Sequence, residues 1–172
     1  NTEFTPIGTS ESPFTGIFDG NGFTISNYSI TTVAPYDGKN SSRYVGLFGV
    51  NKGTIKNLGV KNVNIDIVSA SLIVYVGALV GSNHGIIDNC YSTGLVKIQI
   101  NGTSTLGGLV GRAENTSIIT NSYSSANVVY FSGGSWSIGG FVGSNYGTIE
   151  NCYSTGNVTG EGGSRSFSVS NS

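Results

Sequence analysis

The 172-residue sequence predicts an all-β fold, a parallel β-solenoid (β-helix) of about five coils with ~31 residues each. Three observations carry this prediction: a repeat that runs through most of the chain, a period of two within each repeat, and the lack of any stretch with helical periodicity. The chain is expected to be one domain, residues 1–172. Residues 1–30 form a first coil or lead-in segment, residues 31–160 form four repeats, and residues 161–172 form an incomplete coil or tail.

The repeat is clearest in the tripeptide Ile-x-Asn, which recurs at spacings of 30, 32, 32 and 30 residues. Its five copies begin at Ile25, Ile55, Ile87, Ile119 and Ile149. A second anchor, of the type Gly-Leu-Val-Gly, precedes the last four copies and begins at Gly46, Ala78, Gly108 and Gly140. A short repeat cannot bury its apolar face alone, so stacked copies should pair in parallel, with equivalent Ile-x-Asn positions one coil apart.

Within each copy the apolar residues alternate with the period of a strand, and Asn-x-Gly segments supply turns. The turn from Arg112 to Ser117 is two residues longer than its equivalents, which explains the uneven spacing. A β-propeller is the alternative, but its blades usually need about 40 residues or more.

The segment Gly-Gly-Leu-Val-Gly-x-Asn-x-Gly-x-Ile-x-Asn-Cys-Tyr-Ser-x-Gly-x-Val resembles the GLUG repeat of bacterial and archaeal cell-surface proteins. Residues 77–96 and 139–158 match best, residues 107–128 match with the longer turn, and residues 45–63 match loosely. Residues 13–25 look like the segment that often precedes such repeats. The resemblance implies an extracellular location, a large modular parent protein and an adhesive or scaffolding role. Proteases among GLUG proteins use a separate zinc domain with His-Glu-x-x-His, a motif that this sequence lacks.

Composition narrows the function classes. The formal net charge of −1 gives no long-range field, so neither nucleic acid nor an anionic membrane is an expected partner. No apolar run reaches about 18 residues, so membrane insertion is not expected. The chain begins at Asn1 and contains no methionine, which suggests a removed leader or a piece of a longer protein. Five Asn-x-Ser/Thr sequons are about what chance gives in so Asn-, Ser- and Thr-rich a sequence.

Candidate catalytic groups are few. The single histidine, His84, occupies a turn position where other copies carry Lys52 and Tyr146, which indicates a solvated, variable site. Asp88 and Glu150 occupy equivalent positions two coils apart, ~10 Å, near the upper end of the separation found in inverting glycosidases. Their column alternates outward beside the inward Ile, which is typical of a polar outer face, with Lys56 opposite Asp88 as a favourable pair. We therefore expect no enzyme activity, with a polysaccharide-active enzyme as a remote alternative.

Neither a metal nor another cofactor is expected. Asp19-Gly20-Asn21-Gly22 hints at a calcium loop, but the acidic residue that such a loop requires does not follow, and a tight turn is favoured. Cys90 and Cys152 occupy equivalent positions two coils apart. A separation of ~10 Å exceeds the ~7 Å limit for a disulfide, so both are expected to be unpaired and buried.

The Asn of each tripeptide follows the inward Ile by two positions and is expected to point inward at a bend. Stacked side-chain amides could then bond to one another and to turn backbone, which predicts an internal structural ladder. Its expected members are Asn27, Asn57, Asn89, Asn121 and Asn151.

The best candidates for a binding surface are Tyr91, Tyr123 and Tyr153, which recur at one position of three copies. The small residue before each tyrosine aligns with Leu58 and is expected inside, so the rings should lie outside. Exposed stacked tyrosines could contact a glycan or a protein partner. The alternative is a cross-strand aromatic stack that only stabilises the sheet.

The two ends of the solenoid are expected to need completion, because their strands present unpaired N–H and C=O groups. Residues 1–24 are rich in apolar side chains, and residues 162–169 alternate like the start of a further coil. The rest of a longer protein, or a neighbouring copy, would complete at least one end. Phe4, Phe167 and Val169 are the candidate contacts for such end-to-end assembly.

Together these features predict a non-catalytic extracellular repeat module of a cell-surface protein, with a structural or adhesive role. Its expected partners are the rest of a larger surface protein, other copies of the protein, or glycans. The alternative is a self-assembling subunit of an extracellular filament or sheath.

Overall fold

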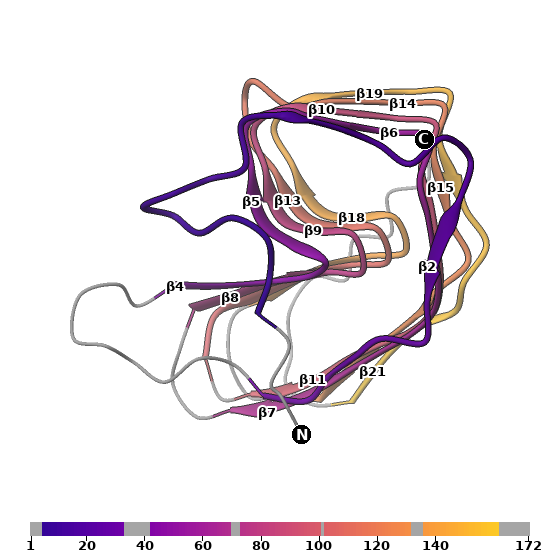
Figure 1. Ribbon diagram of the computed structural model, residues 1–172. Coiled ribbons are helices and arrows are strands. Elements are labelled where there is room, and N and C mark those ends of the chain that lie inside the picture. Colours follow the sequence, from indigo (N-terminus) through magenta and orange to yellow (C-terminus); the bar gives the residue numbers. More distant parts are fainter. Residues whose placement is uncertain (1–4, 33–41, 70–72, 101, 132–135, 162–172) are drawn as a thin grey trace.

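The computed structural model describes residues 5–32, 42–69, 73–100, 102–131 and 136–161, and these residues form strands, turns and bends. Seen down its long axis, the chain winds repeatedly around one interior, and each coil lies behind the one before it (Figure 1). Four complete coils follow one partial coil, which confirms the predicted parallel β-solenoid. No helix capable of crossing a bilayer occurs in the described segments.

Equivalent strands of successive coils pair in parallel and build four sheets. The first sheet contains β1 (Ile17–Asp19), β6 (Thr54–Lys56), β10 (Ile86–Asp88), β14 (Ile118–Thr120) and β19 (Thr148–Glu150). The second contains β2 (Thr24–Ser26), β3 (Ser29–Ile30), β7 (Gly59–Ser69), β11 (Tyr91–Ile100), β15 (Tyr123–Ser124), β16 (Asn127–Phe131), β20 (Tyr153–Ser154) and β21 (Val158–Glu161). The third contains β4 (Ser42–Val45), β8 (Ile73–Gly77), β12 (Ser104–Gly107) and β17 (Trp136–Gly139). The fourth contains β5 (Phe48–Asn51), β9 (Val80–Asn83), β13 (Val110–Ala113) and β18 (Val142–Asn145).

The register confirms that the repeat is one coil long. Ile87 pairs with Ile55 on one side and with Ile119 on the other, and Ile119 pairs with Ile149. Ile55, Ile87 and Ile119 are completely buried, so one apolar column runs through the core. A β-branched side chain at each step suits a pleated strand that is covered on one face.

The first coil differs from the predicted alignment. Phe18, not Ile25, occupies the isoleucine column, because Phe18 pairs with Ile55. Ile25 pairs instead with Val60 in the adjoining sheet. The first Ile-x-Asn therefore lies at a different corner of the coil, and its match to the other four tripeptides is a coincidence. The rings of Phe14 and Phe18 lie 5.1 and 5.5 Å from that of Phe48 and cover the core at this end.

The third and fourth sheets fold back on each other and give the cross-section an inward bend, and the turn between β8 and β9 lies near the middle of Figure 1. Glycines of the fourth sheet lie directly against the backbone of the third. A Cβ on Gly81 would lie 2.7 Å from the N of Val45, and one on Gly111 would lie 2.6 Å from the N of Val76. A residue with a side chain could not approach so closely, so the last glycine of each Gly-Leu-Val-Gly anchor permits the bend.

Candidate functional surfaces

The asparagine that ends each of the last four Ile-x-Asn tripeptides forms a corner between the first and second sheets. Its backbone is left-handed, with φ between 50° and 55° at Asn57, Asn89, Asn121 and Asn151. Asparagine is one of the few side chains that tolerate this conformation. The predicted inward orientation is wrong: Asn57 is partly exposed and the other three are exposed. The left-handed residue interrupts the alternation of the strand, so the position two after an inward Ile faces solvent.

These exposed amides still contact one another along the solenoid. Asn89 donates from Nδ2 to Oδ1 of Asn57 at 2.8 Å, and Asn151 donates in the same way to Asn121 at 3.3 Å. Asn27 is not a member of this column. Its Oδ1 accepts instead from Nδ2 of Asn62, its left-handed equivalent one coil later.

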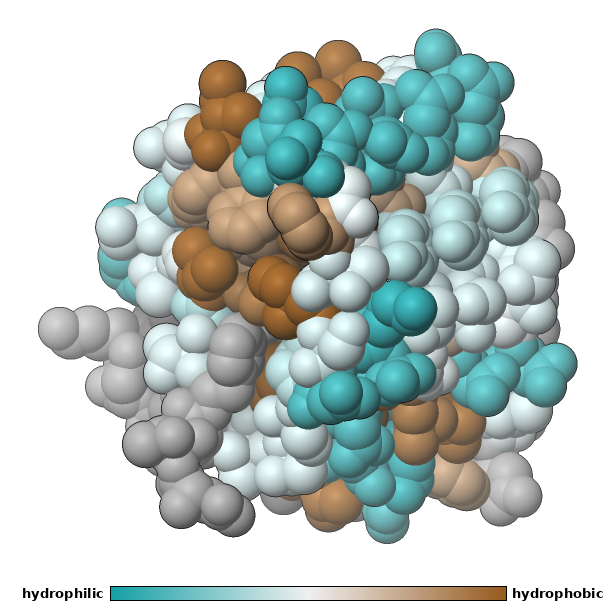
Figure 2. All heavy atoms as spheres, turned by 45° about the vertical axis from the view of Figure 1, so that its right-hand side comes forward, coloured by the Kyte–Doolittle hydropathy of each residue, from teal (hydrophilic) through white to brown (hydrophobic). Residues whose placement is uncertain are grey.

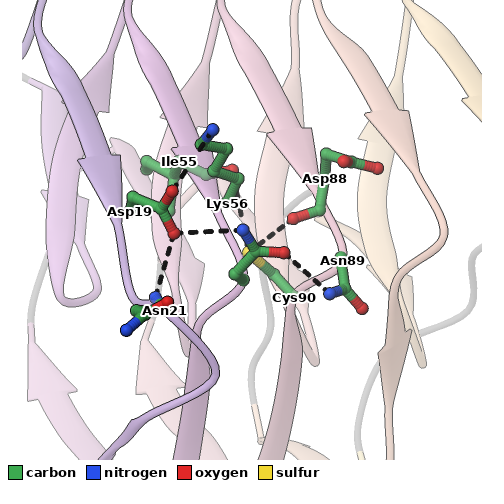
Figure 3. Close-up of polar contacts among 8 residues, drawn as sticks. Asp19, Asn21, Ile55, Lys56, Asp88, Asn89 and Cys90 are labelled. Atoms are coloured by element: carbon green, nitrogen blue, oxygen red, sulfur yellow. Dashed lines mark hydrogen bonds and ion pairs between the residues drawn. The ribbon is translucent and has the colours of Figure 1, made fainter.

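The other two asparagines of this column, Asn57 and Asn121, donate to carboxylates. Asp19 accepts from Asn57 Nδ2 at 3.0 Å, and Asp88 accepts from Asn121 Nδ2 at 2.8 Å. Figure 3 shows Asp19 and Asp88 on either side of Lys56, on three neighbouring strands. Lys56 forms an ion pair with Asp19 at 3.2 Å, and its charge also favours ionised Asp88, which lies opposite it. Figure 2 shows the resulting band of hydrophilic side chains running along the molecule.

Acidification is expected to weaken this corner. The bonds from Asn121 and Thr120 lower the pKa of Asp88, and those from Asn57, Asn21 and Lys56 lower the pKa of Asp19. A carboxyl whose folded-state pKa is depressed contributes stability above its unfolded-state pKa of about 3.9, and that contribution disappears as the pH falls through the folded-state pKa.

Asp88→Asn should therefore reduce the loss of unfolding free energy below pH 4, as measured by urea unfolding at pH 7, 4 and 3. Thr120→Val removes one of the two main donors and should give an intermediate slope. Equal pH slopes in the three proteins would show that the hydrogen bonds to Asp88 do not couple protonation to folding.

The left-handed corner gives a separate prediction. Asn89→Val places a β-branched side chain at φ 51° and is expected to lower the free energy of unfolding by about 1–2 kcal/mol. Asn89→Gly loses the exposed amide bond but tolerates the backbone, so its effect should stay within about 0.5 kcal/mol. Urea unfolding at pH 7 measures both. Equal effects would mean that backbone conformation is not what selects asparagine here.

A buried asparagine ladder exists elsewhere, at the end of the fourth sheet. Asn51 and Asn83 are completely buried, and Asn51 Nδ2 donates to Asn83 Oδ1 at 2.7 Å. In the next coil the longer turn places Ser117 here, and its Oγ accepts from Asn83 Nδ2 at 2.6 Å. Each amide also bonds to its own turn, as when Asn51 Oδ1 accepts from the N of Gly53. These asparagines belong to the Asn-x-Gly segments, which the sequence indicated only as turns and not as a buried ladder.

Tyr91, Tyr123 and Tyr153 form a regular stack on the outside of the second sheet. Their ring centroids are 5.0 and 5.1 Å apart and their planes are within 4° of parallel. The rings therefore cover one another, and the surface along the side of the stack consists of ring edges and hydroxyl groups. The outer face of Tyr153, which is 54% exposed, is the one open end. At the other end, Tyr91 leans over Gly59, where a Cβ would lie 2.4 Å from its ring.

A second stack of planar side chains was not predicted from the sequence, because its members come from different sheets. The ring of Tyr44 lies 5.3 Å from that of Tyr75. In the next coil the guanidinium of Arg112 lies 5.6 Å from the Tyr75 centroid and 4.8 Å from that of Tyr146. An ion pair of 2.8 Å with Glu114 holds Arg112 in this place. Four coils thus contribute one planar group each to a cation–π stack at the inward bend.

The cysteines lie where the sequence predicts. Cys90 and Cys152 are unpaired and buried, and Ser122 lies between them in the column. Burial raises the pKa of the Cys90 thiol to about 12, so the reactive thiolate is disfavoured. Both cysteines are packing residues of the core.

The other candidate positions are dispersed. His84 lies in the turn after β9, where burial lowers its pKa and its carbonyl accepts from Thr116 Oγ1 at 2.7 Å. Glu150 is exposed at the end of β19, two strands from Asp88. The described residues contain no group of three His, Cys, Asp or Glu side chains placed to hold a metal. Phe4, Phe167 and Val169, the candidate assembly contacts, lie outside the described residues.

Comparison with known proteins identifies the repeat. The GLUG motif matches residues 74–99, 102–129 and 134–159, so the second, third and fourth complete coils are GLUG repeats. The resemblance seen in the sequence is confirmed for these three coils, which carry the GLUG motif within a β-solenoid. The loosely matching residues 45–63 lie outside these three matches.

Two longer proteins share this sequence pattern. Halomucin of Haloquadratum walsbyi is 38% identical over 109 residues, which cover 63% of this chain and 1% of that protein. A protein of Evansella cellulosilytica, named as a Gly-rich membrane protein, is 36% identical over 86 residues, which cover 49% of this chain and 9% of that protein. The chain thus spans only a small part of either relative.

One solved structure also matches in outline. It is the crystal structure of a candidate immunoglobulin A1 protease from Bacteroides ovatus, with a TM-score of 0.41 and 17% identity over 95% of this chain and 74% of that one. At this level the likeness says nothing about the activity of the present protein.

Proposed function

We propose that this chain is a non-catalytic structural module of a cell-surface protein. The observation that carries the proposal is the way its polar side chains are used. Equivalent groups bond from coil to coil, as in Asn51 to Asn83, Asn89 to Asn57, and Ser92 to Ser124 at 3.0 Å. Such columns hold one coil to the next and make the stack rigid along its length.

The relatives support the location. Halomucin is a mucin by name, and the Evansella protein is a membrane protein by name. A module with the same repeats is expected at the cell surface. Antibodies raised against the folded chain should label intact, unpermeabilised cells of the source organism. Labelling only after permeabilisation would contradict the proposed location.

The absence of catalysis is tested separately. The purified chain should release no reducing ends from a panel of neutral and acidic polysaccharides. Asp88→Asn and Glu150→Gln provide the matched variants, since these carboxylates occupy the column that an inverting glycosidase would use. Cleavage by the unmodified chain that either variant abolishes would show that the module is an enzyme.

The tyrosine stack is the candidate for an adhesive contact. Its row of phenol hydroxyls recurs at the coil spacing and faces outward, so it could donate and accept hydrogen bonds with a glycan or a protein surface. The triple variant Tyr91→Phe, Tyr123→Phe, Tyr153→Phe keeps the stacked rings and removes only the hydroxyls.

If the stack is adhesive, the triple Phe variant should lose binding on a glycan array or to surface extracts of the source organism while keeping the urea midpoint of the unmodified chain. Unchanged binding by the variant would restrict the stack to a structural role.

A further inference from the structure

We propose that the surface strip along the tyrosine stack binds an extended, uncharged polysaccharide of β-1,4-linked sugars. The sugar chain would lie parallel to the solenoid axis, with about one sugar at each coil. This proposal rests on the adhesive role proposed above for Tyr91, Tyr123 and Tyr153, and it names the class of ligand. The strip lies on the outer face of the second sheet, where these tyrosines pair in register from coil to coil.

The phenol hydroxyls of the stack are available to a ligand. Within the part of the chain that the structure describes, the hydroxyls of Tyr91, Tyr123 and Tyr153 make no hydrogen bond. The buried Tyr28 differs, since its hydroxyl donates to the carbonyl of Ala78. Ring stacking does not use the hydroxyl groups, so each of the three can still donate one hydrogen bond and accept others.

Uncharged polar groups line the strip on both sides. The column two residues before the tyrosines consists of the exposed amides of Asn89, Asn121 and Asn151. The column two residues after them consists of the exposed or partly exposed side chains of Thr93, Ser125 and Thr155. Amides and hydroxyls are the groups that pair with the hydroxyls of a sugar, and they can donate as well as accept.

The charges around the strip disfavour an acidic polysaccharide. Asp88 and Glu150 lie one residue before asparagines of the amide column and carry negative charge. On the other side, Lys97 and Asp66 neutralise each other in an ion pair of 2.9 Å. Lys61 is exposed on the strand that carries Gly59, one coil before the first tyrosine. A neutral chain avoids repulsion from the two carboxylates and needs no counter-charge.

The spacing of the strip selects a ligand that repeats. The ring centroids are 5.0 and 5.1 Å apart and the rings are nearly parallel, so the hydroxyls recur at a regular interval. In a β-1,4-linked chain of glucose type, both bonds that join a ring to its neighbours are equatorial. Such a chain is an extended ribbon that advances by about one ring length per sugar, which is comparable with this interval. A protein partner presents a different side chain at each step and gains nothing from the repetition.

The test measures binding to the full chain by isothermal titration calorimetry. The ligands are the disaccharides, tetrasaccharides and hexasaccharides of β-1,4-linked glucose, xylose, mannose and N-acetylglucosamine. In at least one series the tetrasaccharide should bind about tenfold more tightly than the disaccharide, because its additional hydrogen bonds form within one complex. The hexasaccharide should gain little more, since the stack has three rings in the described coils and Gly59 precedes the first of them.

Tyr123→Phe removes the central hydroxyl and keeps the ring. It should weaken binding of the tetrasaccharide about fivefold and leave the urea midpoint unchanged. Tyr75→Phe makes the same change in the other stack and should bind like the unmodified chain. Two control tetrasaccharides should bind no better than a disaccharide. One is α-1,4-linked glucose, whose axial bond curls the chain, and the other is β-1,4-linked mannuronate, which carries a carboxylate on each sugar.

Three results would overturn the proposal. The first is that no β-1,4-linked series binds more tightly at four sugars than at two. The second is that Tyr123→Phe binds every oligosaccharide as the unmodified chain does. The third is that either control tetrasaccharide binds as tightly as its neutral β-1,4-linked counterparts.

These results bear on neither the cell-surface location nor the absence of catalysis. If no oligosaccharide binds but the triple Phe variant loses binding to surface extracts, the stack is adhesive toward a protein and only the class of ligand is wrong. Failure of this proposal is thus distinguishable from failure of the proposed function.

Discussion

Asn83→Leu is expected to lower the free energy of unfolding by about 3–5 kcal/mol, because it leaves several buried polar groups without partners at once. The amide of Asn83 is completely buried and bonds to Asn51, Ser117 and the carbonyl of Gly85. Leucine has a similar volume, so the loss reports on hydrogen bonds more than on a cavity. Urea unfolding followed by circular dichroism measures it.

Asn145→Leu is the matched control for that change. Asn145 occupies the same position of the repeat in the last coil, where it is exposed and bonds to the N of Gly147. Its replacement should cost no more than about 1 kcal/mol. If the two substitutions have equal effects, the buried ladder is not a main source of stability.

Gly111→Ala is the second substitution with a large expected effect, about 2–3 kcal/mol. A methyl group there would lie 2.6 Å from both the carbonyl oxygen of Gly81 and the N of Val76. Both are backbone atoms of neighbouring strands, so the third and fourth sheets would have to separate to admit the methyl group. The cost is steric, since the φ angle of Gly111 is not in the left-handed region.

Gly160→Ala provides the comparison. It also adds a methyl group to a glycine in a strand, but the nearest heavy atom to that methyl is 3.6 Å away, an ordinary contact. The free energy of unfolding of the Gly160→Ala variant should stay within about 0.5 kcal/mol of that of the unmodified chain or be slightly higher, because alanine restricts the backbone of the unfolded chain. A similar loss for both variants would indicate that glycine is not required by the inward bend.

The two stacks on the surface differ in what they can offer a partner. The Tyr91 stack exposes hydroxyl groups along its side, whereas the stack that contains Arg112 presents a cation held between two rings and balanced by Glu114. Tyr146, 57% exposed, ends this second stack at the last coil. Both stacks thus terminate at the last coil that the structure describes.

The repeat pattern was enough to predict the fold class, the length of the coil and the pairing of Ile55, Ile87, Ile119 and Ile149. It could do so because in a parallel solenoid the neighbour of each residue is its equivalent one repeat later, so the repeat fixes the contact. The positions of Cys90 and Cys152, unpaired and buried in one column, followed from the same rule.

The direction in which the corner residues face could not be predicted in this way and is seen in the folded chain. The period of two places side chains on alternate faces while a strand continues, but the left-handed backbone at Asn89 resets that alternation, so the predicted inward ladder is an outward one. The buried amides are those of Asn51 and Asn83, which lie at a different corner. The contact of Arg112 with Tyr75 likewise depends on two sheets folding back against each other. A repeat predicts contacts between equivalent positions in successive coils, and contacts between different positions arise only when the coil closes around its core.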